Sequence, residues 1–130
     1  MRLTDKVVIG AVLLGLTLVL MARRGNRKVD SYYASLRSDM LRAIDAQNTY
    51  FAAHGRYTTV LDSLRDPYNE RRHFEPSPGV ELAVTRADSA GWELVGRHQL
   101  LPTVCTWRDG APPRPVPDFS GIRRLCTDPP

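Results

Sequence analysis

The chain has 130 residues, which is enough for one small domain and for no more. It carries 18 Lys and Arg against 14 Asp and Glu, a net charge of +4. Residues 1–28 hold six basic residues and one acidic residue, whereas residues 29–130 hold 12 basic and 13 acidic residues. The excess positive charge therefore flanks a single apolar run. The rest of the chain lacks the basic footprint that nucleic-acid binding requires, so we expect no nucleic-acid partner.

The apolar run extends from Val7 to Ala22 and contains no charged residue. As a helix it rises about 24 Å. The hydrocarbon core of a bilayer is about 30 Å thick, so Lys6 and Arg23 must snorkel toward the head groups. A cleaved signal peptide is the alternative, because the run also suits its apolar region. No small-x-small cleavage site precedes Arg23 and a basic cluster follows the run, so the sequence favours an uncleaved single-pass anchor.

The chain is thus expected to fall into four segments. These are an N-terminal tail (1–6), a transmembrane helix (7–22), a basic juxtamembrane hinge (23–28) and an extramembrane domain (29–130). Gly25-Asn26 interrupts the helical pattern inside the third segment, which predicts the hinge.

Two features of the sequence disagree about the side of the membrane on which residues 29–130 lie. Two basic residues precede the apolar run and four follow it, so the positive-inside rule places the domain in the cytoplasm. Cys105 and Cys126 are an even pair around a proline-rich loop, which favours a disulfide and an oxidising compartment. Two unrelated thiols in a cytosolic domain are the alternative. We favour the periplasmic or extracellular side.

A helical pattern runs from Val29 to His54, and Gly55 is a suitable C′ residue to end it. One face carries the residues that step by three or four, namely Tyr33, Leu36, Met40, Ile44, Gln47 and Phe51. Thr58 or Thr59 is then expected to cap a short helix through Leu64.

After a charged loop at 66–72, the period of the pattern changes from 3.6 to 2. Val80 to Val84 and Trp92 to Val95, on either side of a turn at 88–91, predict a β-hairpin. A third strand is expected at 103–108, ending at the Asp109-Gly110 turn, and a short edge strand at 122–126. The fold class is therefore α+β, with a long N-terminal transmembrane-plus-amphipathic helix packed on a small antiparallel sheet.

The sequence contains none of the catalytic or metal-binding motifs that we searched for. The three histidines (His54, His73 and His98) have no carboxylate or cysteine at ligand spacing, and no nucleophile, phosphate-loop or dinucleotide motif occurs. We therefore expect no enzyme activity, no metal, no cofactor and no small-molecule substrate.

In a chain without catalytic motifs, we expect several glycines and aromatic residues to contact partner proteins. Gly10 and Gly15 would allow close approach of another membrane helix, although their spacing is not GxxxG. Tyr32 and Tyr33 follow the anchor closely and suit the interface or a partner. Trp107 is expected to be a core or interface anchor.

Two stretches resemble type IV pilins and pseudopilins. The text from Leu36 to Leu64 (LRSDMLRAIDAQNTYFAAHGRYTTVLDSL) is similar to the pilin helix that ends in AQ-x-x-Y-F-x-x-x-G-x-Y, and Phe74 to Cys105 resembles the strands of the same group. The resemblance implies a long helix on a small antiparallel sheet, held to a bacterial inner membrane with a periplasmic domain. The chain departs from that family in its N-terminal signal. No Gly-Phe precedes the apolar run, and the run holds no Glu.

These features lead us to expect a non-catalytic, single-pass accessory subunit of a larger membrane complex, with membrane and integral membrane proteins as its partners. A bacterial photosynthetic reaction centre with its antenna, or another energy-converting complex, is a candidate for the parent assembly. A minor pseudopilin or pilin subunit of a type II secretion or type IV pilus machine is the alternative.

Overall fold

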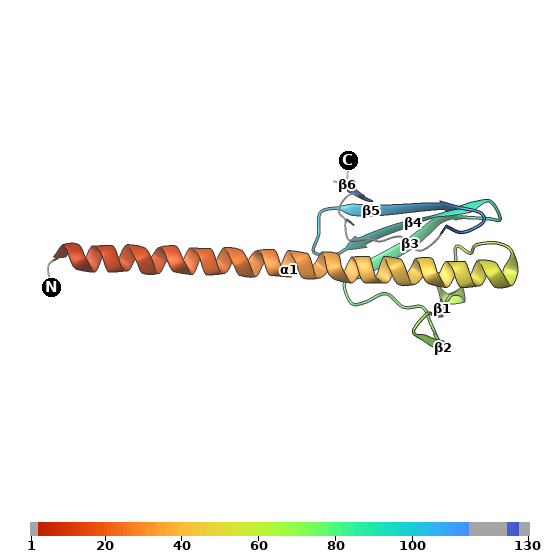
Figure 1. Ribbon diagram of the computed structural model, residues 1–130, viewed down its shortest axis with the longest axis horizontal. Coiled ribbons are helices and arrows are strands. Elements are labelled where there is room, and N and C mark those ends of the chain that lie inside the picture. The colour runs from red at the N-terminus through yellow and green to blue at the C-terminus, as the bar shows by residue number, and fades with distance from the viewer. Residues whose placement is uncertain (1–2, 115–124, 128–130) are drawn as a thin grey trace. The chain divides into compact units, whose positions relative to one another are not determined.

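The computed structural model describes the backbone of residues 3–114 and 125–127, and the side chains of residues 9–114 and 125–127. The elements follow the order α1, a 3-10 turn η1, and then strands β1 to β6 (Figure 1). The chain divides into two compact units, Met1–Ser31 and Tyr32–Pro130. The boundary lies three residues beyond the end of the expected juxtamembrane segment.

Helix α1 extends from Leu3 to His54, and it passes through Gly25 and Asn26 as α-helix. The expected interruption at this pair is therefore wrong. Gly and Asn cost a helix interior about 1 kcal/mol or less each, a small penalty inside a helix of this length. At the other end the prediction is confirmed, because Gly55 adopts a left-handed φ of 70° and its N–H donates to the Phe51 carbonyl at 2.8 Å.

The main sheet is antiparallel with the strand order β3-β4-β5-β6. Its strands are β3 (Val80–Ala87), β4 (Gly91–His98), β5 (Val104–Gly110) and β6 (Cys126–Thr127). The predicted hairpin is confirmed as β3 and β4, with a bulge between Val84 and Arg86. Strand β5 continues through Asp109-Gly110, where a turn was expected, because both residues pair with the start of β4. Of the edge strand expected at 122–126, residues 122–124 lie outside the described residues.

The segment between α1 and β3 differs from its prediction. Only one 3-10 turn, η1 (Leu61–Ser63), forms where a short helix was expected, and its N-cap Val60 makes no side-chain capping bond. The expected loop at 66–72 instead contains a small two-stranded sheet of β1 (Arg65–Asp66) and β2 (Asn69–His73). Asp66 closes its turn by accepting a hydrogen bond from the Tyr68 N–H at 2.9 Å. Every residue of β2 is exposed. The strand therefore lacks the alternation of apolar and polar residues by which a strand is predicted from sequence.

The core lies between one face of the sheet and the part of α1 that belongs to the second unit. The predicted stripe is confirmed, because Leu36, Met40, Ile44 and Gln47 are fully buried and Tyr33 and Phe51 pack against them. Alternate residues of β4 face this stripe, with Trp92 and Leu94 fully buried.

Helix and sheet pack closely at Gly96. A Cβ placed there would lie 3.1 Å from both the Leu36 side chain and the Met40 sulfur, and 2.8 Å from Leu82. The predicted fold, a long N-terminal helix packed on a small antiparallel sheet, is therefore confirmed.

Candidate functional site

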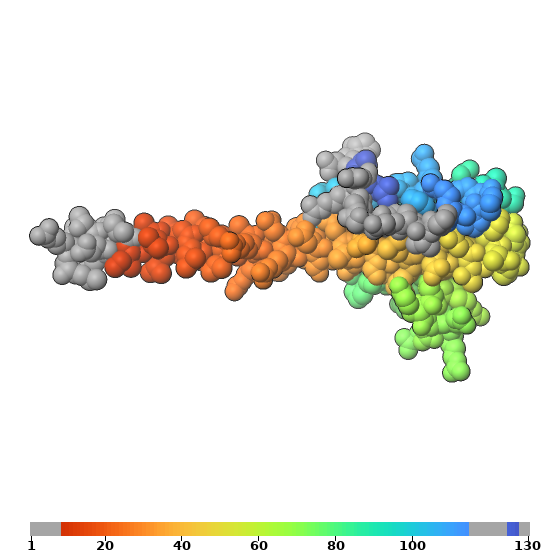
Figure 2. Space-filling view, in the orientation of Figure 1, coloured from red at the N-terminus to blue at the C-terminus, as the bar shows by residue number. Residues whose placement is uncertain are grey.

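The apolar part of α1 is the first candidate surface. From Ile9 to Met21, nine large apolar side chains are 48% to 65% exposed, and they lie on all sides of the helix. The space-filling view shows this segment uncovered on the face that is drawn (Figure 2). By length and composition α1 is able to cross a membrane. An apolar surface of this extent calls for an apolar surrounding, which lipid or another apolar helix supplies.

Gly10 and Gly15 lie inside this apolar segment. A Cβ added to either residue would meet nothing within 4 Å. The two glycines therefore leave open space on the helix surface, and their contact with a partner stays a prediction.

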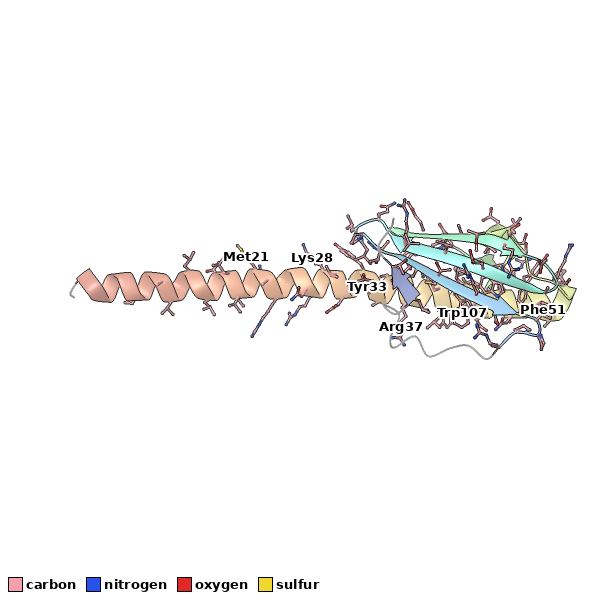
Figure 3. The ribbon with its side chains drawn as sticks, turned by 90° about the horizontal axis from the view of Figure 1, so that it is seen from above. Met21, Lys28, Tyr33, Arg37, Phe51 and Trp107 are labelled. Atoms are coloured by element: carbon pink, nitrogen blue, oxygen red, sulfur yellow. A yellow bond between two sulfur atoms is a disulfide. The ribbon has the colours of Figure 1, made fainter. Side chains whose placement is uncertain are left out.

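A cluster of four cations follows the apolar segment directly. Arg23, Arg24, Arg27 and Lys28 are helical and exposed. Figure 3 labels Met21 and Lys28, which mark the end of the apolar segment and the far end of this cluster.

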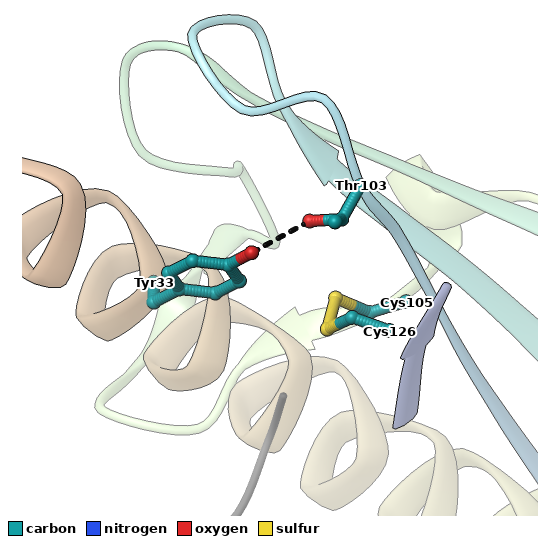
Figure 4. Close-up of a disulfide and its surroundings, with 4 residues drawn as sticks. All are labelled: Tyr33, Thr103, Cys105 and Cys126. Carbon is teal, nitrogen blue, oxygen red and sulfur yellow. Dashed lines mark hydrogen bonds between the residues drawn. A yellow bond between two sulfur atoms is a disulfide. The ribbon is translucent and has the colours of Figure 1, made fainter. Parts of the chain in front are cut away.

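The two tyrosines that begin the second unit contact the chain's own sheet. The Tyr32 ring stacks on His98 with a centroid distance of 4.4 Å and an interplanar angle of 20°. The Tyr33 hydroxyl lies 2.9 Å from the Thr103 hydroxyl, just before β5 (Figure 4). These rings therefore have an intramolecular role that their position in the sequence did not reveal, and partner contact by either stays a prediction.

Cys105 and Cys126 lie opposite each other in β5 and β6, with their sulfur atoms at disulfide-bonding distance (Figure 4). Cys105 is fully buried in the core. The bond ties the short β6 to the centre of the sheet. A two-residue strand has few other contacts with which to hold its register.

Trp107 lies on β5 and packs partly buried against the core (Figure 3). The Arg114 guanidinium covers its ring at 4.6 Å from the centroid, and Arg114 Nε donates to Asp109 at 2.9 Å. The other tryptophan, Trp92, is fully buried. Trp107 thus packs at the edge of the core. Its contact with a partner stays a prediction.

A buried carboxylate, which the sequence analysis missed, ties α1 to the loop before β3. Asp39 is 1% exposed and accepts hydrogen bonds from the Ser77 N–H at 2.6 Å and the Ser77 hydroxyl at 2.9 Å. Arg42 donates to Asp39 at 2.9 Å and to Asp66 at 2.7 Å. The Tyr68 N–H and the Arg42 side chain lower the pKa of the Asp66 carboxyl. The i, i+3 spacing of Asp39 and Arg42 was the only local signal of this network.

Tyr57 forms a second buried polar contact beneath the sheet. Its hydroxyl donates to the Gly110 carbonyl at 2.5 Å, and its ring lies against Phe51 and Trp92. Burial raises the pKa of Tyr57 to about 12, and the negative charge of Asp109 adds to the rise. Both effects disfavour the phenolate.

The polar groups of Asp39, Arg42 and Tyr57 form hydrogen bonds within the fold. Among residues 3–114 and 125–127, no group of three or more His, Cys, Asp or Glu side chains lies close enough to bind a metal ion. Comparison of the chain with known protein families and with curated proteins finds no match.

Replacement of Asp39 by Asn is expected to lower the free energy of unfolding by about 2 kcal/mol or more. The change removes the negative charge to which both Ser77 and Arg42 donate hydrogen bonds. The measurement is chemical denaturation of the full-length chain in detergent, followed by the fluorescence of its two tryptophans. Glu81→Gln is the matched control, since it makes the same change in a solvent-exposed pair with Arg97 and should cost far less stability than the change at Asp39. Equal losses in the two variants would contradict the role of Asp39.

Tyr57 is expected to make stability fall at alkaline pH. Its raised pKa means that the phenol stabilises the fold at pH values below about 10, and that this contribution is lost as the pH rises through about 12. Tyr57→Phe should cost about 1 kcal/mol at neutral pH through the lost hydrogen bond. The difference between wild type and variant should shrink at alkaline pH. Tyr68→Phe, at an exposed tyrosine, serves as the control. A difference that stays constant up to pH ~12 would refute the role of the phenol.

Proposed function

We propose that this protein is a non-catalytic, single-pass, membrane-anchored accessory subunit of a larger membrane protein complex. The observation that carries the proposal is the continuous apolar surface from Ile9 to Met21, which is exposed on every side of α1. Such a surface requires lipid or protein around it. In the domain that follows, the buried side chains of Asp39 and Tyr57 form hydrogen bonds within the fold, as expected of a scaffold.

The proposed partner is another transmembrane helix, packed against the apolar segment of α1. Gly10 and Gly15 support this partner, because each leaves room on the helix surface where a neighbouring backbone can approach. A photosynthetic, respiratory or secretion assembly of a bacterial inner membrane is the candidate parent complex.

We place the domain on the periplasmic side. The support is the cysteine pair, since a disulfide between β5 and β6 persists in an oxidising compartment. The positive-inside rule, applied to the cations after the anchor, favours the opposite side.

A minor pseudopilin is the second candidate function. The fold favours it, because a long N-terminal helix packed on an antiparallel sheet with a C-terminal cysteine pair is the architecture that the resemblance to pilins implies. Intact-mass measurement separates the two candidates. A trimmed and methylated N-terminus supports the pseudopilin, and a chain that keeps Met1 contradicts it.

Association with a larger complex is tested by extracting membranes in a mild detergent, followed by native gel electrophoresis and mass spectrometry. We expect the chain to migrate with integral membrane proteins. Gly10→Leu combined with Gly15→Leu should release it, because the added side chains fill the space needed for close helix approach. Val12→Leu, which enlarges a side chain that is already bulky, should leave the complex intact. A wild-type chain that migrates alone would refute the proposal.

The cysteine pair and the topology are tested together by alkylating freshly prepared membranes and mapping the peptides without reduction. We expect Cys105 and Cys126 to be linked and protected from alkylation. Cys105→Ser should lower the free energy of unfolding by about 2–5 kcal/mol, because the loop between the cysteines is then no longer closed. Two freely alkylated thiols would remove the support for a periplasmic domain and leave the basic cluster as the guide to topology.

A further inference from the structure

The four cations that follow the apolar segment share one side of α1. At about 100° per residue, Arg23, Arg24, Arg27 and Lys28 fall within an arc of about 140° around the helix axis. Gly25 and Asn26, which separate the two pairs, occupy the remaining arc. We call these four side chains the basic face. A hinge was expected at this point, but the helix continues and therefore holds the four charges together.

The basic face is free to bind a ligand. Its four side chains are exposed, and none of them forms an ion pair with another residue in the part of the chain that the structure describes. Asp30, three residues beyond Arg27, adds one negative charge at the edge of this face. Asp30 lies farther from the apolar segment than all four cations, so the face keeps a net positive charge where it borders the membrane.

The length of the basic face matches the thickness of the polar head-group layer of a bilayer. From Arg23 to Lys28 the helix rises about 7.5 Å. The polar layer on each side of the hydrocarbon core is about 5–7 Å thick. The apolar segment is somewhat shorter than that core, so the flexible stems of Arg23 and Arg24 extend along it and bring their guanidinium groups to the phosphates.

From this geometry we propose that the basic face binds the head groups of anionic phospholipids at the membrane boundary of α1. Guanidinium groups match the phosphate oxygens in charge and in bidentate geometry, and Lys28 adds a point charge at the outer edge of the layer. This lipid contact fixes the depth of the helix in the bilayer. It also gives the cations a role on either side of the membrane, so their presence is compatible with a periplasmic domain.

The inference rests on the proposed function in that it requires α1 to be a membrane anchor. To test it, the full-length chain is reconstituted in vesicles made of equal parts of phosphatidylcholine and phosphatidylglycerol. The chain is then extracted again in mild detergent, and native mass spectrometry measures the lipids that stay bound. We expect the wild type to retain phosphatidylglycerol in preference to phosphatidylcholine.

Neutralising the basic face with Arg23→Gln, Arg24→Gln, Arg27→Gln and Lys28→Gln should lower the ratio of bound phosphatidylglycerol to phosphatidylcholine by about tenfold or more. Each cation at an anionic surface contributes about fivefold to binding before mutual screening. The matched control removes four exposed cations of the domain, by Arg56→Gln, Arg65→Gln, Arg71→Gln and Arg72→Gln. It carries the same net charge as the first variant and should change the ratio by less than about twofold, since surface charges away from the membrane are screened.

Three results would overturn the lipid site while leaving the anchor intact. One is an unchanged lipid ratio after the basic face is neutralised, and another is an equal fall in both quadruple variants. The third is co-purification of the wild type with an acidic protein through these cations, without lipid preference, which would assign the face to another partner. Carbonate extraction of the vesicles tests the anchor separately. A wild-type chain released by carbonate would refute the anchor and the lipid site together.

Discussion

The close approach of α1 to β4 is the contact on which the rest of the domain depends. Gly96 leaves room for Leu36 and Met40 against the sheet, and this brings the buried stripe of the helix onto Trp92 and Leu94. A side chain at position 96 would require Leu82, Leu36 and Met40 to shift, because their side-chain ends already lie within about 3 Å of where its Cβ would be. The buried hydrogen bonds of Asp39 and Tyr57 form only because these layers meet.

One continuous helix, α1, presents two kinds of surface. Its first part exposes apolar side chains on every side, whereas its last part buries one stripe and keeps the opposite face polar. Between them lies the basic face, which under the proposed anchoring meets the layer where a bilayer changes from hydrocarbon to phosphate. In the domain, the buried side chains of Asp39 and Tyr57 form hydrogen bonds within the fold.

Much of the fold could be predicted because its signals are local. The stripe from Tyr33 to Phe51 repeats every three or four residues, the hairpin strands alternate with period two, and Gly55 ends the helix in a conformation that suits glycine. Predictions went wrong where local signals were weak or overruled. Strand β2 has no buried face to leave an apolar pattern, and Gly25-Asn26 carries a breaker signal that a long helix absorbs at small cost.

The sequence by itself determined the apolar segment, the cations beside it and the α+β class, because charge and hydrophobic period depend only on neighbours along the chain. Only the tertiary structure decided which partners the polar and aromatic side chains contact. Asp39 meets Ser77 across 38 positions, Tyr57 reaches Gly110 across 53, and Tyr33 meets Thr103 across 70. Such partners come together only when helix and sheet pack, since no local pattern records a contact between residues so distant in the chain.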